Sequence, residues 1–301
     1  MARVTRSQAA KTQGGSSRHN SEQVKDSATA RPKTKPAVKR TKKKLPTTPT
    51  PAKQVKKPSA VAPTSTSLSI ASNGVHSFEV PSAKKPVPCE LHGGPAGTKP
   101  ALLFTHGAGG GMSTPATQDF AKGFATASPI LLYQGTMNLP NRVRACQAVI
   151  DHVEWSAALG GRSMGARAAC IAVAENEGTE AVVLVSYPLV GGKEGTNVRD
   201  QILLDLPGRV KVLFVIGEKD GMCPLEQLDE VRGRMQAPSW LVVIEGADHG
   251  MSVTPKKASE PMRRCTGAMA AEWLRVRDEE KRRRTIRWDA EASVAEMSDW
   301  A

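Results

Sequence analysis

The sequence is poor in aromatic residues and cysteines, and it has no long apolar run. Aromatic side chains make up 4% of the 301 residues, and none occurs before Phe78. The cysteines are Cys89, Cys146, Cys170, Cys223 and Cys265. Their odd number and the lack of a C-x-x-C pair argue against a disulfide framework and a zinc knuckle, and favour a reducing, intracellular compartment. No apolar run reaches about 18 residues, and no hydrophobic signal region opens the chain, so we expect neither a membrane span nor a secretory signal.

Acidic residues are nearly absent from residues 1–60. This segment carries 16 Lys and Arg against two acids, Glu22 and Asp26, a net charge of +14, whereas the whole chain carries +13. Pro, Ser, Thr, Lys and Ala dominate it, so it cannot bury enough apolar surface to offset the entropy of ordering. We predict a disordered basic tail at residues 1–70, one folded domain at residues 71–280 and a charged C-terminal tail at residues 281–301. The basic run 281–284 is interpreted as a solvated helix end.

The basic tail has several possible partners. Its densest cluster, residues 35–44, is typical of segments that bind nuclear import receptors or nucleic acid. A solvated linker would have the same composition. A transit peptide is a third possibility, because the first twenty residues are rich in Arg and Ser and lack acids, although they show no amphipathic apolar face. Nucleus and cytoplasm therefore both stay open, and contacts of residues 1–60 with nucleic acid, chromatin or an import receptor are predictions.

Beyond residue 76, strand-like runs alternate with helical periods. The expected strands are 77–80, 87–91, 101–105, 130–134, 155–159, 181–187, 210–216 and 240–245, and the expected helices are 114–126, 141–152, 166–177, 225–235 and 259–277. The last three strands are nearly continuous apolar runs, as in strands buried on both faces of a parallel sheet. The alternation predicts an α/β fold with a doubly wound, mostly parallel sheet.

A G-x-S-x-G pattern occupies residues 161–165, between an expected strand and an expected helix. In a nucleophile elbow, a sharp strand-to-helix turn lifts the serine hydroxyl above the sheet, and the glycines let neighbouring backbones pass without Cβ clashes. The pattern is short and arises by accident in many proteins. Its weight therefore depends on the groups that follow the other strands. The candidate nucleophile is Ser163.

A candidate acid and a candidate base follow two later strands. Glu218 and Asp220 lie just after strand 210–216, and His249 lies just after strand 240–245. Ligands of open α/β sheets collect outside the carboxyl ends of the strands, so these side chains are expected near the serine. A histidine there can accept the serine proton, and a carboxylate can fix the histidine tautomer. The alternatives are an ordinary Asp-Gly turn and a surface-loop histidine.

A glycine-rich loop at residues 106–111 follows strand 101–105. The backbone N–H of Ala108 or Gly109 is a candidate for one half of an oxyanion hole, and the N–H of Met164 is a candidate for the other half. A dinucleotide loop starting at Gly107 would require glycine where Met112 stands, and no P-loop pattern exists. No H-E-x-x-H or clustered ligand spacing is present either, so we expect no metal and no other cofactor.

Five strings together carry a resemblance to a known family. They are residues 103–110, LFTHGAGG; 161–167, GRSMGAR; 185–189, VSYPL; 220–223, DGMC; and 246–249, GADH. The sequence from about residue 75 to 277 resembles the small α/β-hydrolase-like family of the testis-expressed hydrolase and a regulatory subunit of the nonspecific-lethal histone acetyltransferase complex, which is related to dienelactone hydrolases. Both tails lie outside the resemblance.

The resemblance implies an α/β-hydrolase fold with Ser163 as nucleophile, Asp220 rather than Glu218 as acid and His249 as base. Residues 190–209 are too few for a separate cap domain between strands. We also expect four side chains to line the substrate site: His106, Arg162, Tyr187 and Cys223. Cys223 could equally be a packing residue.

Two functions follow as expectations. The first is a serine hydrolase that acts on a small ester, thioester or related carboxylic acyl substrate. The second is a catalytically silent scaffold or regulatory protein of a nuclear, chromatin-associated complex, since members of the related complex are regarded mainly as scaffold subunits. The complete and correctly ordered triad favours the first.

Overall fold

The computed structural model describes residues 69–71, 74–83, 85–154, 157–191 and 197–301. The predicted basic tail therefore lies outside the described residues, except for its last two positions. These two residues belong to a short strand, β1 (Ser69–Ala71). The predictions about partners of residues 1–60 all fall on residues that are not described.

Strands and helices alternate through most of the described chain. The strands of the main sheet are β1, β2 (Val75–Val80), β3 (Val87–His92), β4 (Leu102–Thr105), β5 (Ile130–Tyr133), β6 (Ala158–Arg162), β7 (Ala181–Val185), β10 (Lys211–Gly217), β11 (Ser239–Ile244), β12 (Arg283–Asp289) and β13 (Val294–Met297). The helices are α1 (Pro115–Phe124), α2 (Leu139–Val153), α3 (Met164–Ala174), α4 (Gln201–Leu204), α5 (Leu225–Arg234), α6 (Ser259–Arg275) and the 3₁₀ turn η2 (Lys256–Ala258).

The main sheet has the strand order β1-β2-β3-β5-β4-β6-β7-β10-β11-β12-β13. Every neighbouring pair from β5 to β12 in this order is parallel, while β1 to β5 at one edge and β12 with β13 at the other pair antiparallel. The order reverses direction between β4 and β6, so the sheet is doubly wound, as predicted. The carboxyl ends of β4, β6, β10 and β11 consequently lie at one edge of the sheet.

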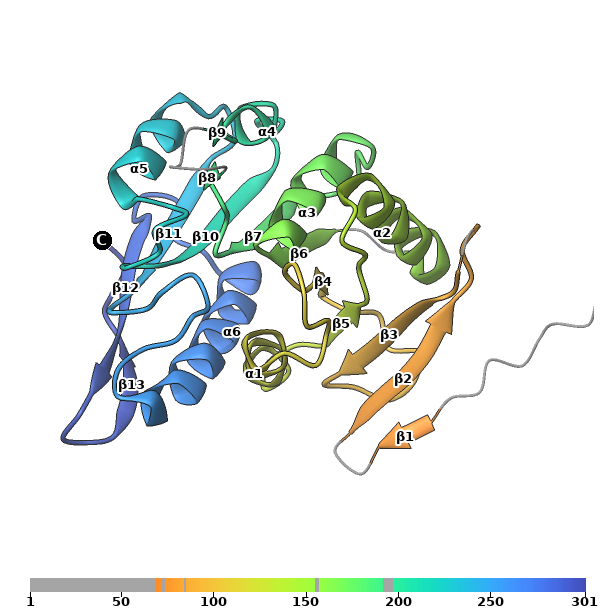
Figure 1. The fold of residues 1–301 in the computed structure, drawn as a ribbon, viewed down its shortest axis with the longest axis horizontal. Helices are drawn as coiled ribbons and strands as arrows, with labels where there is room; N and C mark the ends of the chain where they lie inside the picture. Colours follow the sequence, from red (N-terminus) through yellow and green to blue (C-terminus); the bar gives the residue numbers. More distant parts are fainter. Residues whose placement is uncertain (1–68, 72–73, 84, 155–156, 192–196) are drawn as a thin grey trace, which may run out of the picture. The chain divides into compact units, whose positions relative to one another are not determined.

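Two hydrophobic cores cover the two faces of this sheet. Helices α1 and α6 pack side by side on one face, whereas α2 and α3 lie on the other (Figure 1). Successive strand residues alternate between the two cores: Val182 and Phe214 join the core with α2 and α3, and Val183 and Val215 join the core with α1 and α6. The apolar runs are continuous because each strand is buried on both sides.

Helices α1 and α6 approach each other at two glycines. A Cβ atom on Gly123 would collide with the carbonyl oxygen of Arg264, and a Cβ atom on Gly267 would collide with that of Phe120. Backbone therefore packs directly against backbone at this crossing. Around it, the rings of Phe104 and Phe120 stack with centroids 4.6 Å apart, a contact worth about 1 kcal/mol beyond its buried area.

The strand before the G-x-S-x-G pattern lies further along the chain than predicted. The expectation was 155–159, of which 155–156 lie outside the described residues, and β6 runs from Ala158 to Arg162. Gly160 and Gly161 are strand residues here and not part of a turn. A Cβ atom on Gly160 would lie 2.8 Å from the carbonyl oxygen of Val183 in the adjacent strand, so glycine is required by the close packing of β6.

The prediction of a charged C-terminal tail at residues 281–301 is wrong. Residues 283–286 pair in parallel with β11, and β13 then pairs with β12. Ile286 is fully buried in the core beneath α6. The basic side chains therefore belong to a strand that is paired on both sides and not to a solvated tail. Two of them cover indole rings, Arg282 over Trp240 at 5.0 Å and Arg284 over Trp300 at 4.8 Å.

In the part of the chain that the structure describes, no separate cap domain covers the sheet edge. Between β7 and β10, the described residues form only a short pairing of β8 (Val190–Gly191) with β9 (Asn197–Val198), followed by α4. Among the described helices, none is both long and apolar enough to cross a membrane.

Candidate active site

Ser163 lies at a sharp turn between β6 and α3. Its φ is 53° and its ψ is −115°, a conformation that few residues other than glycine adopt. The N–H of Ser163 donates to the carbonyl of Val185 on β7 at 2.9 Å, which ties the turn to the sheet. A strained serine persists only where the surrounding structure holds it, and such strain concentrates at functional sites.

The glycines on either side of Ser163 make this turn possible. A Cβ atom on Gly161 would collide with the backbone of Gly165, and a Cβ atom on Gly165 would lie 2.5 Å from the carbonyl oxygen of Thr105. The turn therefore folds tightly on itself and packs against the end of β4. This is the physical reason for both glycines of the G-x-S-x-G pattern.

The structure brings the three predicted side chains together. The Nε2 atom of His249 lies 3.0 Å from the Oγ of Ser163, and its Nδ1 lies 2.9 Å from both carboxylate oxygens of Asp220. The Asp220 side chain is fully buried, while 27% of the His249 side chain is exposed. A buried carboxylate on Nδ1 keeps the proton on that nitrogen, which leaves Nε2 free to accept a proton from the serine.

The competing acid has a different role. Glu218 accepts a hydrogen bond from the N–H of Gly246 at 2.8 Å and is exposed. Asp220 also accepts from the N–H of Met222 at 2.9 Å, which fixes its orientation. Of the two acids that the sequence offered after β10, only Asp220 therefore contacts the histidine.

The glycine-rich loop lies directly against the nucleophile. A Cβ atom on Gly107 would be 3.4 Å from the Cβ of Ser163. The N–H of Gly109 donates to the Sδ of Met137 at 3.2 Å, so this amide is already engaged. The N–H of Ala108 has no acceptor among the described residues, and that of Met164 is the first of α3 and lacks a partner within the helix. Of the three candidate amides, those of Ala108 and Met164 therefore have no acceptor among the described residues.

His106 is buried against the glycine-rich loop. Contrary to the expectation, it does not line the substrate site. It is 2% exposed, its Nε2 accepts from the N–H of Gly135 at 2.9 Å, and its Nδ1 donates to the carbonyl of Gly107 at 2.7 Å. Burial and the nearby charge of Arg142 lower the pKa of His106 from 6.5 to about 4. The ring is therefore neutral at physiological pH and serves as a structural connection between β5 and the loop.

Arg142 on α2 is a residue that sequence reasoning missed. Its fully buried guanidinium donates to the carbonyls of His106, Gly107 and Thr136. By binding the carbonyls that precede Ala108, it fixes the direction in which the following amides point. The sequence did contain a signal for this role: a basic residue, four positions after Asn138, lies on the buried side of a predicted helix.

A family comparison agrees with this geometry. Residues 98–274 match the model of the alpha/beta hydrolase domain. The chain belongs to the α/β-hydrolase family. The matched segment contains the turn at Ser163, the glycine-rich loop and both partners of the triad.

Solved structures with the same fold include known hydrolases. Est1E from Butyrivibrio proteoclasticus aligns with a TM-score of 0.53 and 14% identity over 66% of this chain and 99% of its own. Dienelactone hydrolase from Anabaena variabilis ATCC 29413 aligns with a TM-score of 0.54 and 18% identity over 67% and 96%. The esterase domain of a Rhodothermus marinus protein aligns with a TM-score of 0.52 and 16% identity over 67% and 98%. At these identities the likeness concerns the fold.

Two further expected lining residues of this α/β-hydrolase belong to its core. Tyr187 is fully buried, packs edge-on against Phe214 and donates to the carbonyl of Arg199 at 2.7 Å. Cys223 is 1% exposed, and burial, followed by the charge of Asp220, raises its pKa to about 12. Neither side chain is available to a substrate. Cys223 is therefore a packing residue.

Of the four residues expected to line the substrate site of this hydrolase, Arg162 is the one that borders an open pocket. One of its terminal nitrogens donates to the backbone carbonyl of His249, which connects the elbow to the loop carrying the base. Burial lowers the pKa of Arg162, while Asp220 and Asp248 raise it. The pocket has a volume of about 650 Å³ and also contacts Gly250, directly after the base. Within the described residues, no cluster of three or more potential metal ligands occurs.

Proposed function

We propose that the protein is a serine hydrolase acting on a small ester, thioester or related carboxylic acyl bond. The observation that carries this proposal is the continuous hydrogen-bonded relay from Ser163 through His249 to Asp220, with contacts of 3.0 and 2.9 Å. Acyl transfer requires a nucleophile, a base within reach of its proton and donors for the developing oxyanion. All three requirements have candidates at one edge of the sheet.

In the first half of the reaction, Ser163 Oγ attacks the acyl carbon while its proton passes to Nε2 of His249. The carbonyl π electrons move onto oxygen, and the N–H groups of Met164 and Ala108 donate to the resulting oxyanion. Collapse of this intermediate breaks the bond to the leaving group, which takes the proton from His249. An acyl-serine and a free alcohol or thiol result.

In the second half, water replaces the leaving group. His249 accepts a proton from the water as its oxygen attacks the acyl-serine, and then returns that proton to Ser163 Oγ as the ester bond breaks. Asp220 stabilises the imidazolium in both halves and keeps Nε2 directed at the serine. The free acid leaves, and the enzyme returns to its starting protonation state.

The described residues form no cap domain over the serine, and this favours small or extended acyl groups over long lipids. A silent scaffold in a nuclear complex is the less favoured function. It does not require a serine held at positive φ or a histidine within 3.0 Å of its hydroxyl. Membership of the family shared with the nonspecific-lethal complex subunit, and binding of residues 1–60 to nucleic acid, chromatin or an import receptor in the nucleus, stay predictions.

A fluorophosphonate probe tests the proposal, because it labels only an activated serine. We expect the wild-type protein to be labelled and to hydrolyse nitrophenyl esters, with short acyl chains preferred. Ser163→Ala should abolish labelling and lower kcat by about 10⁴-fold or more. Ser113→Ala, which removes an exposed serine beside the glycine-rich loop, should retain full labelling. Labelling that persists in Ser163→Ala, or that is absent from the folded wild type, would contradict the proposal.

A further inference from the structure

The pocket beside the triad has an unusual distribution of charge. It lies between the start of α1 and the segment from Gly250 through η2 to the first turns of α6. Arg162 connects this pocket to the reacting groups: it donates to the carbonyl of His249, and a Cβ atom on Gly107 would lie 2.8 Å from a terminal nitrogen of Arg162 and 3.4 Å from the Cβ of Ser163.

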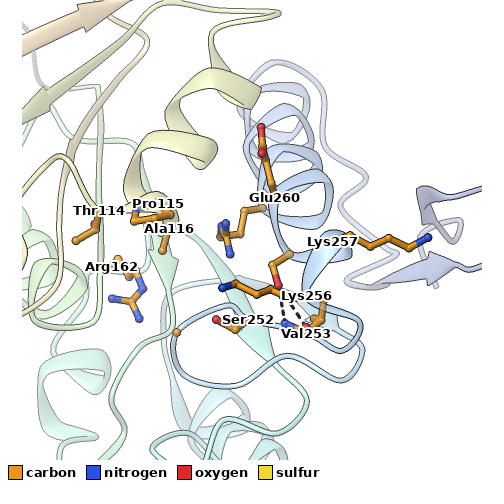
Figure 2. Close-up of a pocket in the computed structure, with 12 residues that line it drawn as sticks. Thr114, Pro115, Ala116, Arg162, Ser252, Val253, Lys256, Lys257 and Glu260 are labelled. Atoms are coloured by element: carbon orange, nitrogen blue, oxygen red, sulfur yellow. Dashed lines mark hydrogen bonds between the residues drawn. The ribbon is translucent and has the colours of Figure 1, made fainter.

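Two of the five charged side chains that line this pocket already have ionic partners. Arg263 forms a buried ion pair with Asp119 at 2.7 Å. Glu260 pairs with Arg264 at 2.9 Å, and Figure 2 shows its carboxylate pointing away from Lys256 and Ser252. These groups neutralise one another and therefore contribute little net charge to the pocket.

Three cationic residues of the lining remain, and the ammonium group of one of them, Lys257, points away from the other two (Figure 2). Lys256 has no acidic partner among the described residues, and its side chain extends past Ser252 towards Arg162 (Figure 2). Arg162 forms no ion pair in the same set of residues, and its buried Nε has no hydrogen-bond partner. The pocket therefore holds a lysine and an arginine that form no ion pair with any described carboxylate.

The carboxylates nearest to Arg162 have other roles. Asp220 binds His249, and Asp248 accepts the N–H of Ser252 at 2.9 Å. The hydroxyl of Ser252 is exposed at the pocket and adds a neutral donor beside the two cations. A lysine, an arginine and a hydroxyl that surround one space form a donor set suited to a carboxylate.

We propose that this pocket binds a carboxylate carried by the acyl substrate, so that the enzyme prefers monoesters or thioesters of dicarboxylic acids over neutral esters of the same length. This inference rests on the proposed hydrolase function and specifies its substrate class. Arg162 and Lys256 hold the free carboxylate, and the ester carbonyl at the other end of the chain lies at Ser163.

The test compares two substrates that differ only in charge, 4-nitrophenyl hydrogen adipate and its neutral methyl ester, with the full-length protein. The quantity measured is the ratio of the two kcat/KM values. We expect the wild type to favour the acid, and Lys256→Gln to lower this ratio by about fivefold, the upper range for an exposed ion pair. Added NaCl should lower the wild-type ratio as well, because salt screens the attraction.

Lys257→Gln is the matched control. Lys257 neighbours Lys256 on η2, but its ammonium group points away from Arg162 and Ser252 (Figure 2). The control removes the same charge from the same turn and should keep the wild-type ratio. Equal ratios in all three proteins, with hydrolysis still dependent on Ser163, would overturn the carboxylate site and leave the hydrolase proposal intact.

A binding measurement tests the anion site if the protein shows no hydrolase activity. If neither ester is hydrolysed and Ser163 is not labelled, the hydrolase proposal fails, and calorimetric titration with adipate then decides the pocket. Binding to wild type and Lys257→Gln that is lost in Lys256→Gln would support an anion site. Absence of binding, or binding insensitive to Lys256→Gln, would overturn it.

Discussion

Two buried basic side chains, Arg142 and His106, form hydrogen bonds with the backbone of the glycine-rich loop and hold its conformation. Arg142 donates to three backbone carbonyls. His106 connects the loop to Gly135, which lies two residues after the end of β5. The charge of Arg142 and burial both disfavour protonation of His106. The loop is therefore built around a neutral imidazole, and acid should weaken it.

His106 predicts a pH dependence of stability. In the unfolded chain its pKa is 6.5, and in the folded protein it is about 4. Between these values the unfolded state binds more protons, so the free energy of unfolding falls as the pH is lowered through this window. The loss attributable to His106 is about 3 kcal/mol between pH 7 and pH 4. Urea unfolding of wild type and His106→Gln at a series of pH values measures it.

The control for this measurement is His152→Gln, which removes an exposed histidine on α2. It should keep the wild-type slope, whereas His106→Gln should flatten it. A steep slope that persists in His106→Gln would mean that other groups carry the acid sensitivity.

At the scale of the structural elements, helices α1 and α6 pack backbone against backbone. These helices cover the face of the sheet from which the carboxylate pocket opens, and both contribute residues to that pocket. Because their backbones meet at Gly123 and Gly267, no larger residue fits without moving one helix. The position of the pocket wall thus depends on residues that have no side chain.

Gly267→Ala should destabilise the protein by about 1–3 kcal/mol, because the added methyl group overpacks the crossing. Gly233→Ala is a matched change on α5, where a Cβ atom meets no neighbour within 4 Å. It should stabilise the protein by about 0.5–1 kcal/mol through helix propensity alone. Thermal and urea unfolding compare the two. A similar gain from both substitutions would show that the helices do not touch as described.

At the scale of the whole molecule, the C-terminal strands extend the sheet beyond the segment matched by the family model. β12 covers the edge of β11, and its Ile286 is completely buried, while Val294 on β13 is 46% exposed. The strands therefore share a core with α6, and we expect them to unfold together with the rest of the domain.

Ile286→Ala should lower the free energy of unfolding by about 2–4 kcal/mol, and calorimetry should still record one transition for the domain. Val294→Ala changes an exposed residue of the neighbouring strand and should stay within about 0.5 kcal/mol of wild type. A separate early transition in Ile286→Ala would instead identify β12 and β13 as an independently unfolding unit.

Local patterns predicted the strands well where each strand is buried on both faces. The runs before Asp220 and His249 were recognised within about two residues, because continuous apolar segments are hard to mistake. The strand before Ser163 was displaced, since Gly160 and Gly161 read as turn residues. β12 was missed because its arginines were interpreted as part of a solvated tail, although Arg284 lies over Trp300 and Arg282, just before the strand, lies over Trp240.

The candidate site was predictable in its chemistry and less so in its contacts. The order of Ser163, Asp220 and His249 after successive strands is a property of the sequence. The burial of Tyr187 and Cys223, and the structural use of His106, depend on how neighbouring elements pack around them. A sequence pattern gives the residue type at a strand end, but it does not say which way the side chain turns.

The sequence by itself determined the alternation of strands and helices, the tight turn around the serine and the order of the reactive groups, because these depend on near neighbours along the chain. Only the tertiary structure decided that Arg142 supports the loop and that Lys256 faces Arg162, and it brought Asp220 to the histidine where strand-end patterns alone had left Glu218 open. Those outcomes depend on distances between residues far apart in the chain, which are fixed only when the sheet and its two helical layers pack together.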